Sequence, residues 1–119
     1  MTEPEIFSAK LHGQTIEIQL AASIEEDPIA PFDLRAAVEA LVEQHQLSCV
    51  IVSLSQLTRC TTPLINGLIN LHKSLSQSGQ SMKLCHVPIV IRQILNELKL
   101  ENVFLIFPSV SDALRDEGA

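Results

Sequence analysis

The sequence predicts an α/β protein: a mixed, mainly parallel β-sheet packed with helices. Short β-branched segments alternate along the chain with segments of helical periodicity, and the connections between them are short. Such an order favours right-handed crossovers between parallel strands. The 119 residues are 46% hydrophobic and include no Trp or Tyr, so the core is expected to consist of aliphatic side chains and four Phe residues. We expect one domain over residues 1–119, which is long enough to fold without disulfide bonds.

The first predicted elements are a β-hairpin and a helix. Residues 6–11 and 15–20 are candidate strands, and the second of them alternates apolar and polar side chains. His12-Gly13 supplies the turn between the two strands. Apolar residues then recur at helical spacing over residues 33–46, where Asp33 is available as the N-cap.

A buried strand and a long helix are expected next. Residues 49–54 are continuously apolar or small and largely β-branched, which is typical of a strand that is covered on both faces and parallel to its neighbours. A helix is predicted from Pro63 to about residue 78, and Gly79 is a natural residue to end it. The apolar stripe of this helix consists of Leu64, Leu68, Leu71 and Leu75.

The remaining elements continue the alternation. Residues 82–85 and 103–107 are predicted strands, and residues 88–98 between them are a predicted helix. The segment from Ser109 to Asp112 matches a capping box and predicts a last short helix.

Charge and composition restrict the classes of partner. Fourteen acidic and eight basic residues give a net charge of −6, which argues against binding to nucleic acid or to an anionic membrane and favours a basic or neutral protein. No apolar stretch approaches the roughly 18 residues of a membrane span, and a cytoplasmic protein is expected. The three cysteines lack CxxC spacing, so free thiols are expected, without a metal or other cofactor.

The segment LTRCTTPLINGL, residues 57–68, places two hydroxyl groups where a strand passes into the long helix. With Pro63 at the first helical position, the hydroxyl of Thr62 is expected to accept a hydrogen bond from the first turn as the N-cap. A second interpretation is that an exposed hydroxyl at this end of a helix is a favourable place for a phosphate, which Arg59 could pair.

Residues 49–114 resemble the STAS domain, the fold of bacterial anti-sigma-factor antagonists. The resemblance rests on the order of the elements, on Gly79 after the long helix, and on the closing phrase FPSVSDAL. It implies a regulatory protein that works by partner switching. In such proteins the unphosphorylated antagonist binds an anti-sigma factor or a related switch kinase, and phosphorylation at the start of the long helix abolishes binding.

The family's phosphoacceptor motif, Asp-Ser-Ser/Thr-Gly, aligns its first Ser with Thr62. Its aspartate falls on Thr61, its second hydroxyl residue on Pro63 and its glycine on Leu64, so the chain departs from the motif at these three positions. The resemblance therefore implies Thr62 as the candidate phosphoacceptor, with Thr61 as the second candidate. The implied partner-binding surface consists of Arg59, Thr61, Thr62, Leu64, Ile65 and Leu68.

Two alternative functions are compatible with the sequence. One is a STAS protein that is not phosphorylated and serves as a subunit of a larger assembly or binds a nucleotide or lipid-like ligand; a homodimer also fits. The other is a small metal or redox protein that uses Cys60, Cys85 and His86, which fall near the ends of two neighbouring predicted strands. His45 and His72 are interpreted as boundary residues or as partners of a helix C-terminal dipole, and not as catalytic residues. No enzyme motif is present, and an enzyme is not expected.

Overall fold

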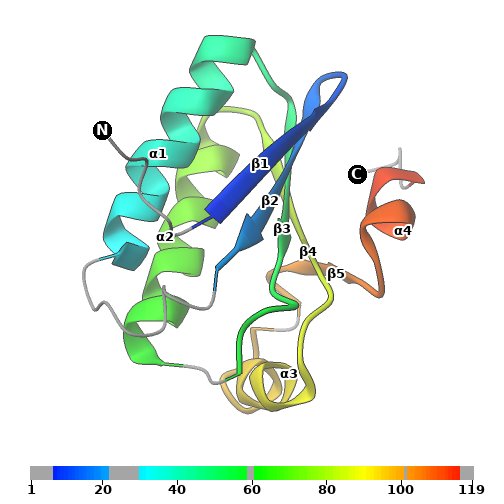
Figure 1. The fold of residues 1–119 in the computed structure, drawn as a ribbon. Helices are drawn as coiled ribbons and strands as arrows, with labels where there is room; N and C mark the ends of the chain where they lie inside the picture. The colour runs from blue at the N-terminus through cyan, green and yellow to red at the C-terminus, as the bar shows by residue number, and fades with distance from the viewer. Residues whose placement is uncertain (1–6, 22–29, 59–60, 101, 116–119) are drawn as a thin grey trace.

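A five-stranded sheet with the strand order β1-β2-β3-β4-β5 forms the centre of the computed structural model (Figure 1). The residues that the structure describes are 7–21, 30–58, 61–100 and 102–115. β1 is antiparallel to β2, and the other three neighbouring pairs are parallel. The strands are Phe7–His12 (β1), Thr15–Leu20 (β2), Cys49–Ser53 (β3), Ser81–Cys85 (β4) and Leu105–Phe107 (β5). The predicted mixed, mainly parallel sheet is therefore confirmed, and β3 is its central strand.

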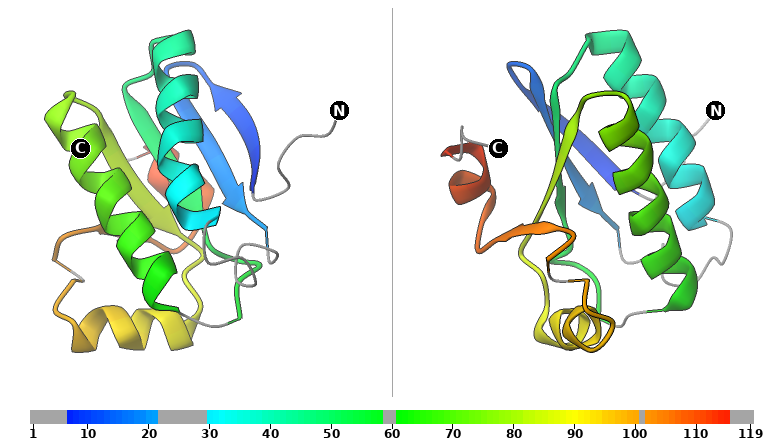
Figure 2. Two further views of the ribbon diagram at one scale, coloured as in Figure 1. Left: turned by 90° about the vertical axis from the view of Figure 1, so that its left-hand side faces the viewer. Right: turned by 180° about the vertical axis from the view of Figure 1, so that it is seen from behind.

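Helices cover the sheet from three directions (Figures 1 and 2). α1 and α2 lie side by side on one face, α4 lies on the opposite face, and α3 lies at the end of the sheet where β4 finishes. None of the helices in the described ranges is long and apolar enough to cross a membrane. The helices are Ala30–His45 (α1), Thr62–Gln77 (α2), Ile89–Glu97 (α3) and Val110–Arg115 (α4).

The main core lies between the sheet and the pair α1 and α2. Because side chains alternate along a strand, every second residue of β2 and β3 faces this layer. The apolar stripe predicted for the long helix is buried there, as expected. A smaller cluster on the other face lies beneath α4. The main core includes Ile16, Ile18, Leu20, Val50, Val52, Leu64, Leu68, Leu71 and Leu75.

Two glycines occupy turns that need a left-handed backbone. Gly13 has φ +65° in the turn of the hairpin, which the structure places at residues 13–14 after His12 ends β1. Gly79 has φ +85° after α2, and the next amide, that of Gln80, donates to the Leu75 carbonyl over 2.8 Å. The predicted helix end at Gly79 is confirmed.

Two predicted boundaries were wrong. The first helix begins at Ala30, so Asp33 lies inside it and is not its N-cap. Pro31 is compatible with the first turn of a helix because the N–H groups there have no intrahelical partner. The last strand begins at Leu105 instead of residue 103, because the amide of Val103 bonds the Leu100 carbonyl over 2.9 Å in a turn.

Candidate functional site

Thr61 caps the N-terminus of α2. Its side-chain oxygen accepts a hydrogen bond from the Leu64 amide over 3.3 Å, and its carbonyl accepts from the Ile65 amide over 3.1 Å. Its backbone is extended, with φ −106° and ψ 157°, as expected for an N-cap residue. The prediction that Thr62 is the cap was therefore wrong by one residue. The helix begins one residue before Pro63, which can occupy the second position because it has no N–H to satisfy.

Thr62 is the first residue of α2 and is exposed. Its hydroxyl has no hydrogen bond to any residue in the part of the chain that the structure describes. The first turn of α2 contains no acidic residue, so nothing in it opposes the positive end of the helix dipole. Thr62 thus presents a free hydroxyl at the positive end of the helix dipole, which is a favourable environment for an added anion.

The apolar residues of the predicted surface lie in the core. Leu64 is 1% exposed, Ile65 is 6% exposed and Leu68 is fully buried against the sheet. These three members of the implied partner-binding surface are therefore not exposed in this fold. Their role is to fix the first two turns of α2 on the sheet, so that Thr62 is held in a defined position.

A polar stripe extends from Thr62 along the solvent side of α2. Its members are exposed and follow one another at intervals of three or four residues, which is the spacing of one helix face. Sequence reasoning missed this stripe, although it is the complement of the leucine stripe on the same helix. The stripe consists of Thr62, Asn66, Asn70, Lys73 and Gln77.

The proposed cysteine and histidine site is not assembled in the described residues. Cys85 is fully buried at the end of β4, and burial raises the pKa of its thiol to about 11. His86 follows it with φ +52° and is exposed. Among the described residues, no three His, Cys, Asp or Glu side chains are placed to hold a metal ion. Cys60 and Arg59 lie outside the described residues.

The two helix histidines differ in their surroundings. His45 is exposed in the last turn of α1. His72 is half-buried on α2 and meets the ring of Phe104 edge to face, with 5.4 Å between the ring centres. Its Nδ1 atom is buried without a hydrogen-bond partner in the described structure. The interpretation of His72 as a boundary residue agrees with this packing.

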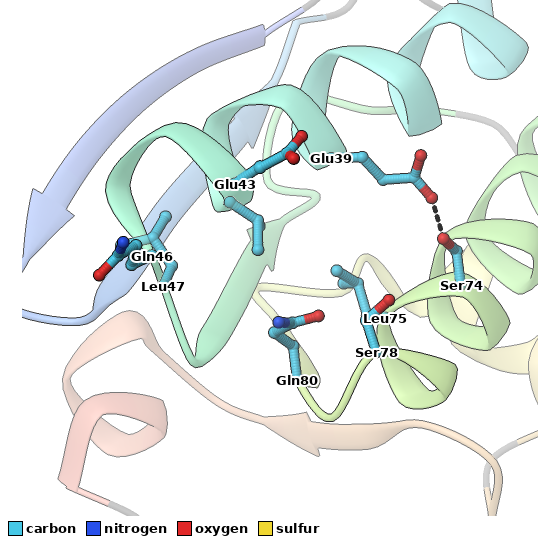
Figure 3. Close-up of a pocket in the computed structure, with 9 residues that line it drawn as sticks. Glu39, Glu43, Gln46, Leu47, Ser74, Leu75, Ser78 and Gln80 are labelled. Carbon is cyan, nitrogen blue, oxygen red and sulfur yellow. Dashed lines mark hydrogen bonds between the residues drawn. The ribbon is translucent and has the colours of Figure 1, made fainter.

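A cleft that the sequence did not reveal lies between the C-terminal halves of α1 and α2 (Figure 3). It has a volume of about 700 Å³, and Glu39 on one wall is hydrogen-bonded to Ser74 on the other. Glu43 also lines it, and none of the described residues that line it is a Lys or an Arg. The cleft is formed by the far ends of the two helices, so it does not include Thr62. Its lining residues are Glu39, Val42, Glu43, Gln46, Leu47, Ser74, Leu75, Ser78 and Gln80.

Comparison with known proteins gives one family and several similar structures. A family model, the STAS domain, matches residues 30–113. The Thermotoga maritima protein TM1081 superposes with a TM-score of 0.84 at 15% sequence identity, over 98% of this chain and 91% of that chain. The unphosphorylated anti-sigma factor antagonist SpoIIAA from Bacillus gives 0.75 at 15% identity, over 95% and 97% of the two chains.

A chain from the stressosome, described as a signal integration and transduction hub, gives a TM-score of 0.77 at 9% identity, over 90% of this chain and 92% of that one. No curated protein sequence matches this chain. At these identities the structural likeness establishes a common fold.

Proposed function

The chain belongs to the STAS domain family, whose model matches residues 30–113, and from this premise we propose that it is a regulatory module that binds other proteins by partner switching. The similarity of its fold to anti-sigma factor antagonists supports an anti-sigma factor or a switch-kinase-like protein as the class of partner. The net charge of −6 fits a basic or neutral binding surface on that partner.

Thr62 is the proposed switch residue. The single observation that carries this proposal is that its hydroxyl is exposed and free, whereas the neighbouring Thr61 hydroxyl serves as the cap of α2. Phosphate on Thr62 therefore need not break the cap. It would add about −1.5 to −2 charges at the positive end of the helix, where the helix dipole stabilises an anion.

The switch would act on the partner and leave the fold unchanged. A partner surface that fits a neutral hydroxyl must desolvate a dianion once Thr62 is phosphorylated, which is unfavourable without a matching cation. The start of α2 is held rigidly by the buried Leu64 and Leu68, so it cannot move away to relieve this cost. Arg59 remains a proposed charge partner of the phosphate.

The alternative, a subunit of a larger assembly that binds without phosphorylation, is supported by the likeness to a stressosome chain and by the departures from the phosphoacceptor motif at Thr61, Pro63 and Leu64. The ligand-binding alternative gains less from the structure. Among the described residues that line it, the cleft between α1 and α2 carries Glu39 and Glu43 and no basic residue, which disfavours a nucleotide or an anionic lipid there.

Capture of the partner from the native host, followed by binding measurements on the purified pair, tests the proposal. The partner should bind the unmodified chain, and phosphorylation mapped to Thr62 by mass spectrometry should abolish that binding. A partner that binds the Thr62-phosphorylated chain equally well would support the constitutive alternative. If an anti-sigma factor or kinase is never bound in either state, the proposed function is wrong.

A further inference from the structure

A second apolar cluster lies beneath α4, on the face of the sheet opposite α1 and α2 (Figures 1 and 2). Cys49 and Ile51 of β3, Cys85 of β4 and Ala113 of α4 form it, and three further apolar side chains pack against it. Ile51, Cys85 and Ala113 are fully buried. None of these residues belongs to the site at the start of α2, so the cluster needs an account of its own.

A buried lysine links α4 to the sheet. Lys83 of β4 is only 4% exposed. Its Nζ donates a hydrogen bond to the Ala113 carbonyl over 2.9 Å and lies 5.5 Å from the centre of the Phe107 ring. An ammonium group is costly to remove from water unless polar partners replace its hydration. The docked α4 therefore supplies one of the polar contacts that stabilise the buried ammonium group of Lys83.

The helix above this cluster, α4, is short and packs mainly on this face of the sheet. α4 has six residues, and a helix of that length is not stable in water without tertiary contacts. Its principal contacts are with β3, β4 and β5. The main core belongs to a separate cluster on the other face. Undocking α4 would thus break the small cluster and leave the main core intact, which is the condition for local opening.

We propose that α4 is a releasable strap, latched by the hydrogen bond from Lys83 to Ala113, and that its opening controls access to the thiols of Cys49 and Cys85. In the closed state both thiols are buried in the cluster. In the open state they meet solvent and any electrophile or oxidant it contains, while Lys83 regains water. The inference does not depend on the proposed switch at Thr62.

The chemistry of Cys85 agrees with a closed strap. Burial raises the pKa of its thiol to about 11, the Ser53 hydroxyl opposes this rise and the Glu17 carboxylate adds to it. Since the thiolate is the reactive form, the docked strap suppresses reaction twice, by excluding the reagent and by keeping the thiol protonated.

Iodoacetamide labelling and hydrogen exchange of the whole chain test the proposal. With Cys60→Ser as the background, mass spectrometry reads Cys49 and Cys85 separately. We expect both thiols to be protected by the same factor as the amides of α4, and at least tenfold less than the amides of Leu68 and Leu71 in α2. If instead the Cys85 thiol is protected by the same factor as those α2 amides, α4 opens only when the whole fold opens. That result would overturn the proposal.

Matched substitutions on α4 separate undocking from general damage. Ala113→Gln places a long side chain at a fully buried position, whereas Ser111→Gln places the same side chain at an exposed position of the same helix. The first should speed labelling of Cys85 at least tenfold with unchanged protection of α2, and the second should stay within twofold of the background. Equal rates for the two variants, or loss of α2 protection in Ala113→Gln, would contradict a releasable strap.

The latch itself is tested by Lys83→Ala, with Lys73→Ala on the exposed stripe of α2 as its control. Lys83→Ala should raise the labelling rate of Cys85 relative to exchange of the α2 amides by several-fold. Lys73→Ala should leave this ratio unchanged. An unchanged ratio in Lys83→Ala would show that the hydrogen bond to Ala113 does not hold the strap.

Discussion

The Thr61 hydroxyl oxygen accepts a hydrogen bond from the Leu64 amide over 3.3 Å, and this contact leaves the neighbouring Thr62 hydroxyl free. The two threonines at the start of α2 therefore have different roles. Thr61 stabilises the helix end, and Thr62 faces solvent in the first turn. The cap of α2 and the proposed switch can therefore be changed separately at these two positions.

Thr61→Ala should lower the free energy of unfolding by about 1 kcal/mol, because it removes the side-chain acceptor of the N-cap. Thr62→Ala should change it by less than about 0.5 kcal/mol, since an exposed residue without a hydrogen bond is replaced. Urea denaturation of the two variants measures the difference. A larger loss for Thr62→Ala than for Thr61→Ala would contradict the assignment of the cap.

Leu68→Ala should destabilise the fold by about 2–5 kcal/mol, because it removes a fully buried side chain from the main core. Ile89→Ala is the matched control, since Ile89 is 75% exposed on α3 and its truncation should cost less than about 0.5 kcal/mol. Thermal or urea unfolding measures both. Similar small effects of the two changes would indicate that Leu68 lies on the surface after all.

Gly79→Ala should cost about 1 kcal/mol of unfolding free energy, because a side chain is disfavoured at φ +85°. A Cβ atom at this position would meet no other atom within 4 Å, so the backbone conformation alone accounts for the loss. Gly79→Asn should cost less, since Asn tolerates the left-handed region. If Asn and Ala were equally damaging, the explanation by backbone conformation would fail.

Stability should fall at high pH through Cys85. Its pKa in the folded state is about 11, above the value near 9 expected of an exposed thiol, so the unfolded chain loses this proton first. The contribution of the Cys85 thiol to the free energy of unfolding is fully present below about pH 9. It is lost as the pH rises toward 11, by at most about 1.4 kcal/mol per pH unit. Urea unfolding from pH 8 to 11 should show a shallower decline in Cys85→Ala than in the wild type. Parallel curves for the two proteins would contradict a buried, protonated thiol.

Most of the fold could be predicted from local patterns. The continuous β-branched run of β3 predicted a strand that is buried on both faces, and the leucine stripe of α2 predicted a helix with one apolar face. The start of α1 could not be placed, because both Asp33 and the residues around Pro31 are acceptable at a helix start and only the packing of the whole helix decides between them. The same limit explains the one-residue error at the cap of α2, where two adjacent threonines have equal propensity.

The candidate site was harder to predict than the fold. Leu64, Ile65 and Leu68 were expected on a partner surface. All three are instead buried, because the apolar face of α2 packs against the sheet. The exposed positions are the polar ones, beginning with Thr62 and Asn66. The cleft between α1 and α2 depends on the relative placement of two helices, which no local pattern encodes.

Calorimetric binding of the captured partner to folded Thr62→Glu protein tests the central claim most directly. Glu is electrostatically tolerated in the first turn of a helix, so the variant should fold normally. Its charge should nevertheless weaken partner binding by about a hundredfold or more, roughly 2.7 kcal/mol. Asn70→Glu adds the same charge two turns along the exposed stripe of α2 and should leave the affinity within a few-fold of wild type. Equal affinity of Thr62→Glu and the wild-type protein would contradict a switch at Thr62.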